Sequence, residues 1–426
     1  MTNDPIPTPS IEDLQEDPMA EENDHIFERR ELLRPQHVPD KSRIVGRDQE
    51  IELVEELLKP AAVGEPPENG FLFGKTGTGK SLVAKHVTGR ARGIAQMKDV
   101  SLAAAYVDCD QYNTETRAAR QIVLAVRDSI DPDRNIPESG VGASRYYDEL
   151  WGDDGLLTDV DAFVAILDEI DKLGEDSTEV LSKLSRSEEA GKTGCYIGVL
   201  AISNKTDYTD APDERVASSF QDDPMVFPPY DADQISEILE RRADAFKEGA
   251  LSDDVIPLAA ALAARDHGDA RRALDILRTA GKLAKKTGDK QVTTDHVNQA
   301  DEYSDINRSI KLIQSGTPHA RYALFALAYL TKTKLDDSFR TTEIFDVYKQ
   351  IAPAVGSDPV THQRILELMK KWSLPEITEN YHTGGGKSEG SYREHRLLHD
   401  SEIVMNAAIS SEERKEVIDQ LNKQRI

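Results

Sequence analysis

Several features that define other classes of protein are scarce in this chain of 426 residues. It has two cysteines, Cys109 and Cys195, at no metal-type spacing, which excludes a disulfide scaffold and favours a reduced cytosol. No apolar run approaches the roughly 20 residues that span a bilayer, so we expect no membrane partner. The N-terminus, MTNDPIPTPS, has neither a basic segment nor an apolar core segment, which predicts no secretory signal and a cytoplasmic location.

Basic residues are also in short supply. Lys and Arg number 52 against 78 Asp and Glu, which gives a formal charge of -26. An ordinary acidic enzyme or acidic partner-binding tails would account for this balance. We favour a salt-loaded cytoplasm, because the excess carboxylates are spread along the chain and strong salt screens their repulsion to within a few Å.

The order of apolar segments divides the chain into five parts. Residues 1–40 hold eleven acidic and three basic side chains and few apolar ones, which predicts a disordered or loosely attached tail. Apolar runs of strand length alternate with helical segments over 41–228, which predicts a parallel sheet covered by helices. Helical periodicity alone continues over 229–312, a small helical domain. Three helices and a Gly-rich hairpin follow over 316–406, in winged-helix order, and 407–426 is expected to be a helical tail.

The most specific motif is a complete G-x-x-x-x-G-K-[ST] sequence between an apolar strand and a helix. Its glycines permit a turn whose backbone N–H groups face phosphate oxygens, and the helix N-terminus adds positive charge. Lys80 then supplies a mobile cation to the β- and γ-phosphates, and Ser81 offers a hydroxyl to Mg²⁺. The predicted phosphate loop comprises Gly74, Lys75, Thr76, Gly77, Thr78, Gly79, Lys80 and Ser81.

A second motif, FVAILDE, ends an apolar strand in two acids. We expect Asp168 to orient Mg²⁺ or its water shell and Glu169 to polarise the attacking water as a general base. Such a pair is common in acidic proteins, so its assignment to the nucleotide site depends on the presence of the phosphate loop.

Weaker signals fit the same site. Asn204 follows a predicted strand and is placed to fix the lytic water, although a turn residue would look the same. Asp269 is a plausible helix cap, and Arg271 then projects toward the phosphates, unless it is a surface arginine. Arg215 is either a finger that completes a neighbouring copy's site or another surface residue. Tyr230 and Arg242 are also assigned to nucleotide binding.

Together the motifs resemble the archaeal Orc/Cdc family of replication initiators over about residues 38–400. The resemblance is carried by HVPDKSRIVGRDQEIELVEELLKPA, FLFGKTGTGKS, ILDEIDKL, AISNKTDY, DERVASSF and GDARRALDILR. It implies an α/β AAA+ P-loop core with a parallel sheet, an all-helical lid and a C-terminal winged helix. It also implies ATP or ADP with Mg²⁺ as cofactors, Val45 and Arg47 beside the adenine, Arg215 as the family's box-seven arginine, and a DNA-touching insertion within about residues 110–150.

By the same resemblance, the partners are double-stranded origin DNA, the replicative helicase and possible further copies of the chain on DNA. Arg364 is the best candidate for a DNA contact, and residues 360–396 carry six basic and five acidic side chains, a weak electrostatic footprint. A winged helix used for protein contacts therefore stays open. The predicted DNA-binding residues are Thr361, His362, Gln363, Arg364, Lys387 and Arg393.

Two functions compete. The first is an ATP-switched initiator with slow hydrolysis, associated with the nucleoid. The second is a divergent DNA-binding regulator or plasmid-maintenance factor that keeps ATP or ADP as a structural ligand. A clamp-loader-like subunit lacks support, because a C-terminal winged helix is not the pattern of that family.

Overall fold

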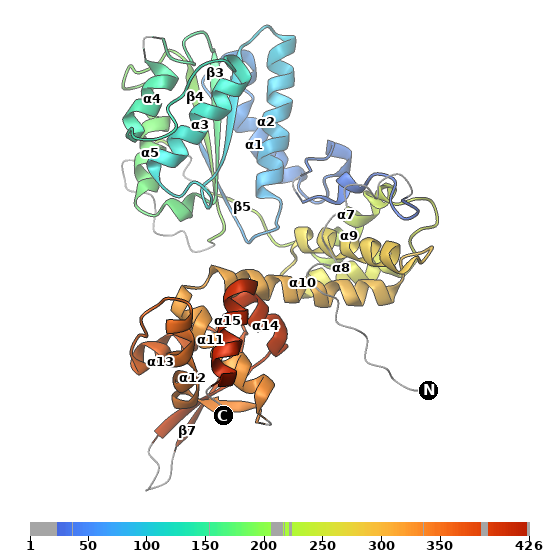
Figure 1. Cartoon of the computed structure of the whole chain (residues 1–426). Helices are drawn as coiled ribbons and strands as arrows, with labels where there is room; N and C mark the ends of the chain where they lie inside the picture. The colour runs from blue at the N-terminus through green and yellow to red at the C-terminus, as the bar shows by residue number, and fades with distance from the viewer. Residues whose placement is uncertain are drawn as a thin grey trace. The chain divides into compact units, whose positions relative to one another are not determined.

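The computed structural model describes residues 24–35, 37–152, 154–205, 216, 218–220, 224–334, 336–384 and 391–423. The chain divides into two compact units, Met1–Ala300 and Asp301–Ile426 (Figure 1). The division falls inside helix α10 (Thr294–Ser315), whereas the sequence suggests that the lid extends to residue 312. No helix in the described part of the chain is both long enough and apolar enough to cross a bilayer.

The first unit is built on a five-stranded parallel sheet in the order β2-β3-β4-β1-β5. Its strands are β1 (Gly70–Phe73), β2 (Leu102–Asp108), β3 (Ala162–Asp168), β4 (Tyr196–Ser203) and β5 (Met225–Val226). The four longer strands confirm the predicted apolar runs, and the two-residue β5 was not predicted. Every residue of β3 is buried, as expected for the central part of a parallel sheet.

Helices cover both faces of this sheet. The α1 and α2 helices pack on one face, and α3, α4 and α5 pack on the other (Figure 1). Their bounds are α1 (Asp48–Leu58), α2 (Lys80–Met97), α3 (Glu115–Ile130), α4 (Ala143–Trp151) and α5 (Asp176–Ser185), with short 3-10 turns η4 (Lys41–Arg43), η5 (Ala61–Val63) and η6 (Ile170–Leu173). Two separate apolar cores result, one on each face of the sheet, and they hold the strand ends in place.

The lid follows β5, and its regular structure is helical apart from isolated β-bridges at Phe246 and between Leu251 and Val292. It comprises α7 (Ala232–Glu240), η7 (Ala243–Ala245), α8 (Val255–Arg265), α9 (Ala270–Thr287) and the first part of α10. Asp231 and Gln234 form a reciprocal capping box at the start of α7, which fixes where the chain turns from sheet to lid.

The prediction of a loosely attached tail is wrong for its described residues from Asp24 onward. The Phe27 ring packs against that of Phe246 with centroids 5.0 Å apart, and the two residues form a β-bridge; the 3-10 turn η3 (Arg30–Leu33) buries two leucines. The Asp24 carboxylate accepts a 2.8 Å hydrogen bond from the Lys285 ammonium. This segment is therefore part of the lid, because a few apolar residues there are enough to anchor an acidic stretch. Residues 1–23 lie outside the described part of the chain.

The second unit has the predicted winged-helix order. It contains α11 (Pro318–Thr333), α12 (Thr341–Ala354) and α13 (His362–Lys371), then the hairpin β7 (Thr378–Gly384) and β8 (Ser391–Leu397). A third strand, β6 (Ser338–Arg340), pairs with β8 to give the antiparallel order β6-β8-β7.

The predicted C-terminal tail is also an integral part of this unit. Helices α14 (Ser401–Ala408) and α15 (Ser411–Lys423) follow the hairpin, and Val417 and Leu421 are buried in the same core as α11 and α12. The helix α15 agrees with the predicted helical tail, and its packing against α12, which the sequence did not predict, makes it part of this unit.

Candidate nucleotide and DNA sites

The phosphate loop has the predicted strand–loop–helix arrangement, between the end of β1 and the start of α2 at Lys80. Gly77 and Gly79 have φ angles of 79° and 90°, in the left-handed region that favours glycine. A Cβ atom on Gly77 would lie 1.8 Å from Oδ1 of Asp269, so only glycine allows the lid to approach the loop this closely. The shape of the loop therefore depends on the backbone conformations that only its glycines adopt without strain.

Lys80 is almost fully buried within the loop. Its Nζ donates hydrogen bonds of 2.7 Å to the carbonyl oxygens of Gly74 and Lys75. Burial lowers the pKa of Lys80 to about 8, an effect that the nearby Asp168 carboxylate partly opposes and Arg271 reinforces. An anion placed here would stabilise the charged form of an ammonium that has already lost most of its water.

The acidic pair at the end of β3 also lies where the sequence predicted it. Asp168 is buried, and Glu169 has a φ of 54°, which is rare for a residue other than glycine. Nδ2 of Asn204 donates a 2.9 Å hydrogen bond to Oε1 of Glu169. Burial raises the pKa of Glu169, which favours proton acceptance near neutral pH. The structure thus brings together the two residues predicted to handle the attacking water.

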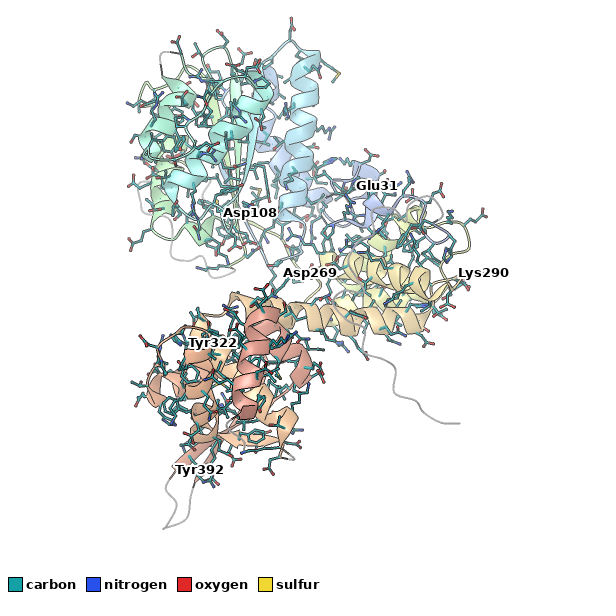
Figure 2. The ribbon with its side chains drawn as sticks, viewed as in Figure 1. Glu31, Asp108, Asp269, Lys290, Tyr322 and Tyr392 are labelled. Carbon is teal, nitrogen blue, oxygen red and sulfur yellow. The ribbon has the colours of Figure 1, made fainter. Side chains whose placement is uncertain are left out.

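The lid contributes the start of α9, where Asp269 lies (Figure 2), to the same site, because the Ala270 N–H donates a 3.4 Å hydrogen bond to the Gly77 carbonyl of the phosphate loop. Oδ1 of Asp269 accepts hydrogen bonds from the backbone N–H groups of Arg271 and Arg272, at 2.8 and 3.4 Å, which confirms the predicted cap. Arg271 lines a cavity together with Gly77, Gly79 and Ser81 of the phosphate loop. Arg215 lies outside the described residues, so its predicted finger role stays a prediction.

A cavity of about 350 Å³ lies within the first unit, and its wall combines the phosphate loop, the lid and the segment before α1. The volume of the cavity and its mixture of polar and apolar residues are typical of a small-molecule site. Its lining includes Pro35, His37, Val38, Arg43, Ile44, Val45, Gly77, Gly79, Ser81, Leu82, Lys85, Tyr106, Asp108, Tyr230, Ile238, Arg242, Ala270, Arg271, Leu274 and Asp275.

The prediction for Val45, Tyr230 and Arg242 agrees with this lining. Arg242 is buried, and its Nε has no hydrogen-bond partner among the described residues, so it is a donor available to a ligand. Ser81 and the carboxylate of Asp168 are the hard oxygen donors that Mg²⁺ prefers, and a close-fitting glycine loop lies beside them. The residues present therefore fit a magnesium nucleotide.

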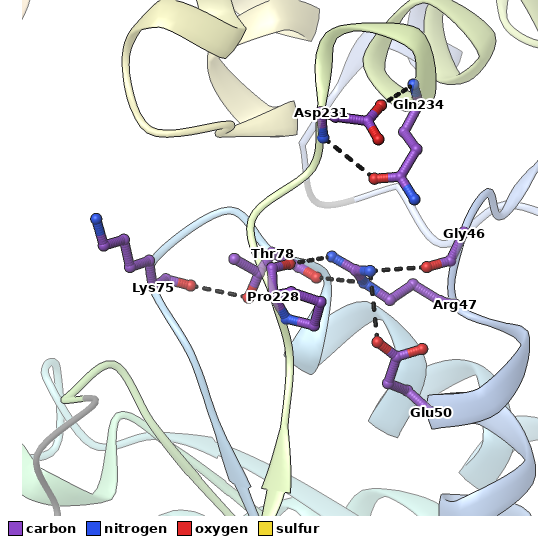
Figure 3. A network of polar contacts seen from close by, with 8 residues as sticks. All are labelled: Gly46, Arg47, Glu50, Lys75, Thr78, Pro228, Asp231 and Gln234. Atoms are coloured by element: carbon purple, nitrogen blue, oxygen red, sulfur yellow. Dashed lines mark hydrogen bonds and ion pairs between the residues drawn. The ribbon is translucent and has the colours of Figure 1, made fainter.

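Arg47 is not among the residues that line the cavity, although its contact Tyr230 is, so its place beside the adenine stays a prediction. Its guanidinium donates to the carbonyl oxygens of Thr78, Gly46 and Pro228, at 2.9, 2.7 and 2.5 Å (Figure 3). It also stacks 3.9 Å above the Tyr230 ring. Arg47 is absent from the cavity wall because it ties the start of α1 to the phosphate loop and to the strand that leads into the lid.

Some residues of the site were missed by sequence reasoning. Pro35, His37 and Val38 come from the segment predicted to be a tail. Lys85 carried a usable signal, since it lies four residues after Ser81 and so on the same face of α2. Tyr106 and Asp108 alternate along one face of β2, a period-2 pattern that indicates only a strand.

The candidate DNA surface lies on α13 and the wing. Thr361, Gln363 and Arg364 are exposed, and Thr361 caps the helix by accepting the Arg364 N–H at 3.3 Å. The Arg364 guanidinium donates a 3.0 Å hydrogen bond to the Glu367 carboxylate. It is therefore available for DNA only in competition with that carboxylate.

Two other members of the predicted surface differ from the expectation. His362 turns inward, with its ring edge-on to Phe345 at 5.3 Å and a buried Nε2, because the first turn of α13 packs on α12. Arg393 is half-buried on β8. Lys387 lies outside the described residues.

Comparison with known proteins identifies the three domains of the chain. An AAA ATPase domain matches residues 43–197, a Cdc6 AAA+ ATPase-type lid domain matches 236–302, and a Cdc6 C-terminal winged helix domain matches 311–407. ORC1-type DNA replication protein 4 of Halobacterium salinarum is 43% identical over 91% of this chain and 94% of its own length. ORC1-type DNA replication protein 9 of Haloarcula marismortui is 43% identical over 89% of this chain and 90% of its own.

A solved structure supports the same family. The Aeropyrum pernix Orc1 protein, determined in complex with DNA, is 30% identical, with a TM-score of 0.76 over 94% of this chain and 100% of that one. The two sequence relatives come from halophilic archaea, in agreement with the salt-loaded cytoplasm that the charge balance predicts. With a parallel AAA+ core, a helical lid and a winged helix in one chain, this protein belongs to the Cdc6/Orc1 family of AAA+ replication proteins.

Proposed function

We propose that this chain is an ATP-dependent initiator that binds origin DNA and supports loading of the replicative helicase. The observation that carries the proposal is the cavity lined by the phosphate loop and by Arg271 of the lid, with the β3 acids Asp168 and Glu169 acting electrostatically on Lys80 of the loop. Its relatives are named as ORC1-type replication proteins, and one was solved on DNA. The proposed location is the cytoplasm, at the nucleoid, because duplex DNA is the partner.

In this proposal Mg-ATP is held by groups already arranged for it. The loop amides and Lys80 bind the phosphates, and Ser81 and Asp168 hold Mg²⁺, which when bound offsets phosphate charge. Glu169, fixed by Asn204, takes the proton of the attacking water. Arg271 links the nucleotide to the lid, so hydrolysis would change the contact between lid and phosphate loop. Slow hydrolysis would then reset the initiator.

The winged helix supplies the DNA contacts in this proposal. Gln363 and Arg364 on α13 enter the major groove, and Lys387 and Arg393 of the wing hold phosphate. Several copies of the chain would bind repeated elements at one origin. The near balance of acidic and basic residues over 360–396 suits strong salt, where release of counterions contributes little to binding.

The test is a nuclease footprint over inverted repeats beside the chain's own gene. Wild type should protect the repeats, and Arg364→Ala should protect them less. With nucleotide present, the footprint of Lys80→Ala should differ from that of wild type. If none of the three proteins protects any site, sequence-specific origin binding is wrong.

The Arg364–Glu367 ion pair favours one alternative, a DNA-binding regulator that keeps ATP or ADP as a structural ligand. A strong origin binder would gain from a free arginine at this position. This alternative predicts nucleotide that stays bound through purification and shows no turnover even with DNA. Measured hydrolysis that DNA modulates would favour the initiator.

A further inference from the structure

The Asp168 carboxylate is held by a residue from a neighbouring strand. Tyr106 lies on β2, which runs parallel to β3 with Asp108 opposite Asp168. The Tyr106 hydroxyl donates a 2.7 Å hydrogen bond to Oδ2 of Asp168, while Oδ1 accepts a 3.1 Å bond from the Glu169 backbone N–H. Each oxygen thus has one fixed donor, and each keeps a lone pair for another ligand.

The Tyr106 ring is in turn held by a cation from α2. The ammonium of Lys85 lies 3.4 Å from the ring centroid, a cation–π contact. Lys85 shares a helix face with Ser81, since the two are four residues apart. Ser81, Lys85 and Tyr106 all line the same cavity. A continuous series of contacts therefore runs from Lys85 through Tyr106 to Asp168, beside the hydroxyl of Ser81.

We propose that Tyr106 is a positioning residue that fixes the orientation of the Asp168 carboxylate for Mg²⁺, and that Lys85 fixes the Tyr106 ring. This inference rests on the proposed function of the site as a magnesium nucleotide site. The two Asp168 bonds act on both oxygens, so they set the rotation of the carboxylate as well as its position. Without the hydroxyl, Oδ2 loses its only donor among the described residues, and the carboxylate rotates more freely.

The plain alternative is that Tyr106 only packs. Its ring contacts the apolar core between the sheet and α2, where a phenylalanine would serve equally well. The two roles differ in their consequence for Mg²⁺: if Tyr106 only packs, removing its hydroxyl should not change the Mg²⁺ dependence of nucleotide binding.

The experiment is Tyr106→Phe in the full chain, with binding of a fluorescent ATP analogue measured against free Mg²⁺ and again in EDTA. Partners of metal ligands typically change metal affinity by roughly 10- to 100-fold, and for one hydroxyl we expect the Mg²⁺ requirement to rise roughly 10-fold. Affinity in EDTA should match wild type. An unchanged Mg²⁺ requirement, or an equal loss with and without Mg²⁺, would overturn the proposal.

The matched control is Tyr147→Phe on α4. The Tyr147 hydroxyl is also buried, but it has no hydrogen-bond partner among the described residues, so its loss should leave the Mg²⁺ requirement unchanged. If Tyr106→Phe does not fold, Lys85→Met tests the same series of contacts. It should raise the Mg²⁺ requirement by a smaller factor, and any loss of binding in EDTA should be smaller than the loss with Mg²⁺.

A Lys85→Met variant that weakens binding equally in EDTA would show that Lys85 contacts the nucleotide itself, which contradicts its proposed role. Binding by the wild-type protein distinguishes failure of the proposed nucleotide site from failure of the proposed role of Tyr106. If it binds no nucleotide at all, the proposed function fails. If it binds with a Mg²⁺ dependence that Tyr106→Phe does not alter, only the present inference fails.

Discussion

The nucleotide cavity and the α13 surface recognise charged ligands by opposite means. In the nucleotide site, Lys80 and Asp168 are 4% and 7% exposed, and Glu169 has a left-handed backbone. Buried charge and backbone strain both cost folding free energy, so their presence together indicates a site that is maintained for its ligand. On α13, Arg364 and Glu367 are both about half exposed.

An exposed pair of this kind contributes at most about 1 kcal/mol to stability and would look the same on a protein that never meets DNA. The comparison teaches that an enclosed site is recognisable from its own physics. A surface for duplex DNA is recognised mainly through its relatives. Variants in the nucleotide site and on the α13 surface would test this contrast.

The largest effect is expected at Arg47. Arg47→Ala removes three buried donors and leaves the carbonyls of Gly46, Thr78 and Pro228 without them, so we expect a loss on the order of 3–5 kcal/mol of unfolding free energy. Hydrogen–deuterium exchange of peptides from β1 and α2 should rise sharply. Arg92→Ala, at an exposed position of α2, serves as the control. Normal stability with lost adenine selectivity would instead support the place beside the adenine that the resemblance implied.

Lys80→Ala is expected to act mainly on ligand binding, with a smaller loss of stability from its two hydrogen bonds to loop carbonyls than Arg47→Ala causes. A hydrogen bond to a charged group contributes about 1.5–3 kcal/mol, so affinity for ATP should fall by roughly 10- to 100-fold. Calorimetric titration measures it. Lys98→Ala, at the exposed far end of the same helix, should bind as wild type does. Equal affinities for the two variants would show that the loop alone binds the phosphates.

The sequence predicts the cavity well where one segment carries all of the information. The phosphate loop, the acids of β3 and the Asp269 cap each depend on a short run of neighbours, and each was found. The contacts of Arg47 and the role of Tyr106 were not predicted, because their partners Pro228 and Asp168 lie far away along the chain and are brought close only by strand order. The winged helix shows the same division, since its helices were predicted and the inward turn of His362 was not.

A smaller effect is expected at a buried histidine of the second unit. The His395 Nδ1–H donates to Oδ1 of Asn380 at 2.5 Å, and Nε2 accepts from the Thr341 hydroxyl at 2.9 Å. Burial, with Arg393 and Lys370 nearby, lowers the pKa of His395 to about 4. The folded state therefore binds this proton more weakly than the unfolded chain. Its stability is full above about pH 6.5 and declines toward pH 4.

We expect a loss on the order of 2 kcal/mol by pH 5 from this residue alone. The measurement is the urea midpoint in a Trp151→Phe background, in which Trp372 of the second unit is the remaining tryptophan. His395→Gln should show a shallower decline over the same pH range. A decline of equal slope in both proteins would assign the pH dependence to the carboxylates.

The smallest effect, and the one most informative about the surface, concerns Glu367. If Arg364 meets DNA, Glu367 competes for its guanidinium, so Glu367→Gln should strengthen DNA binding by a factor of up to about 5, which corresponds to about 1 kcal/mol. Asp346→Asn removes the same charge from α12, where Asp346 pairs with Lys349 at 2.9 Å, so it controls for net charge. Equal gains in fluorescence anisotropy titrations would mean that both variants act through overall charge. A gain for Glu367→Gln alone, abolished by adding Arg364→Ala, would place the DNA contact on α13, because only there does the freed arginine matter.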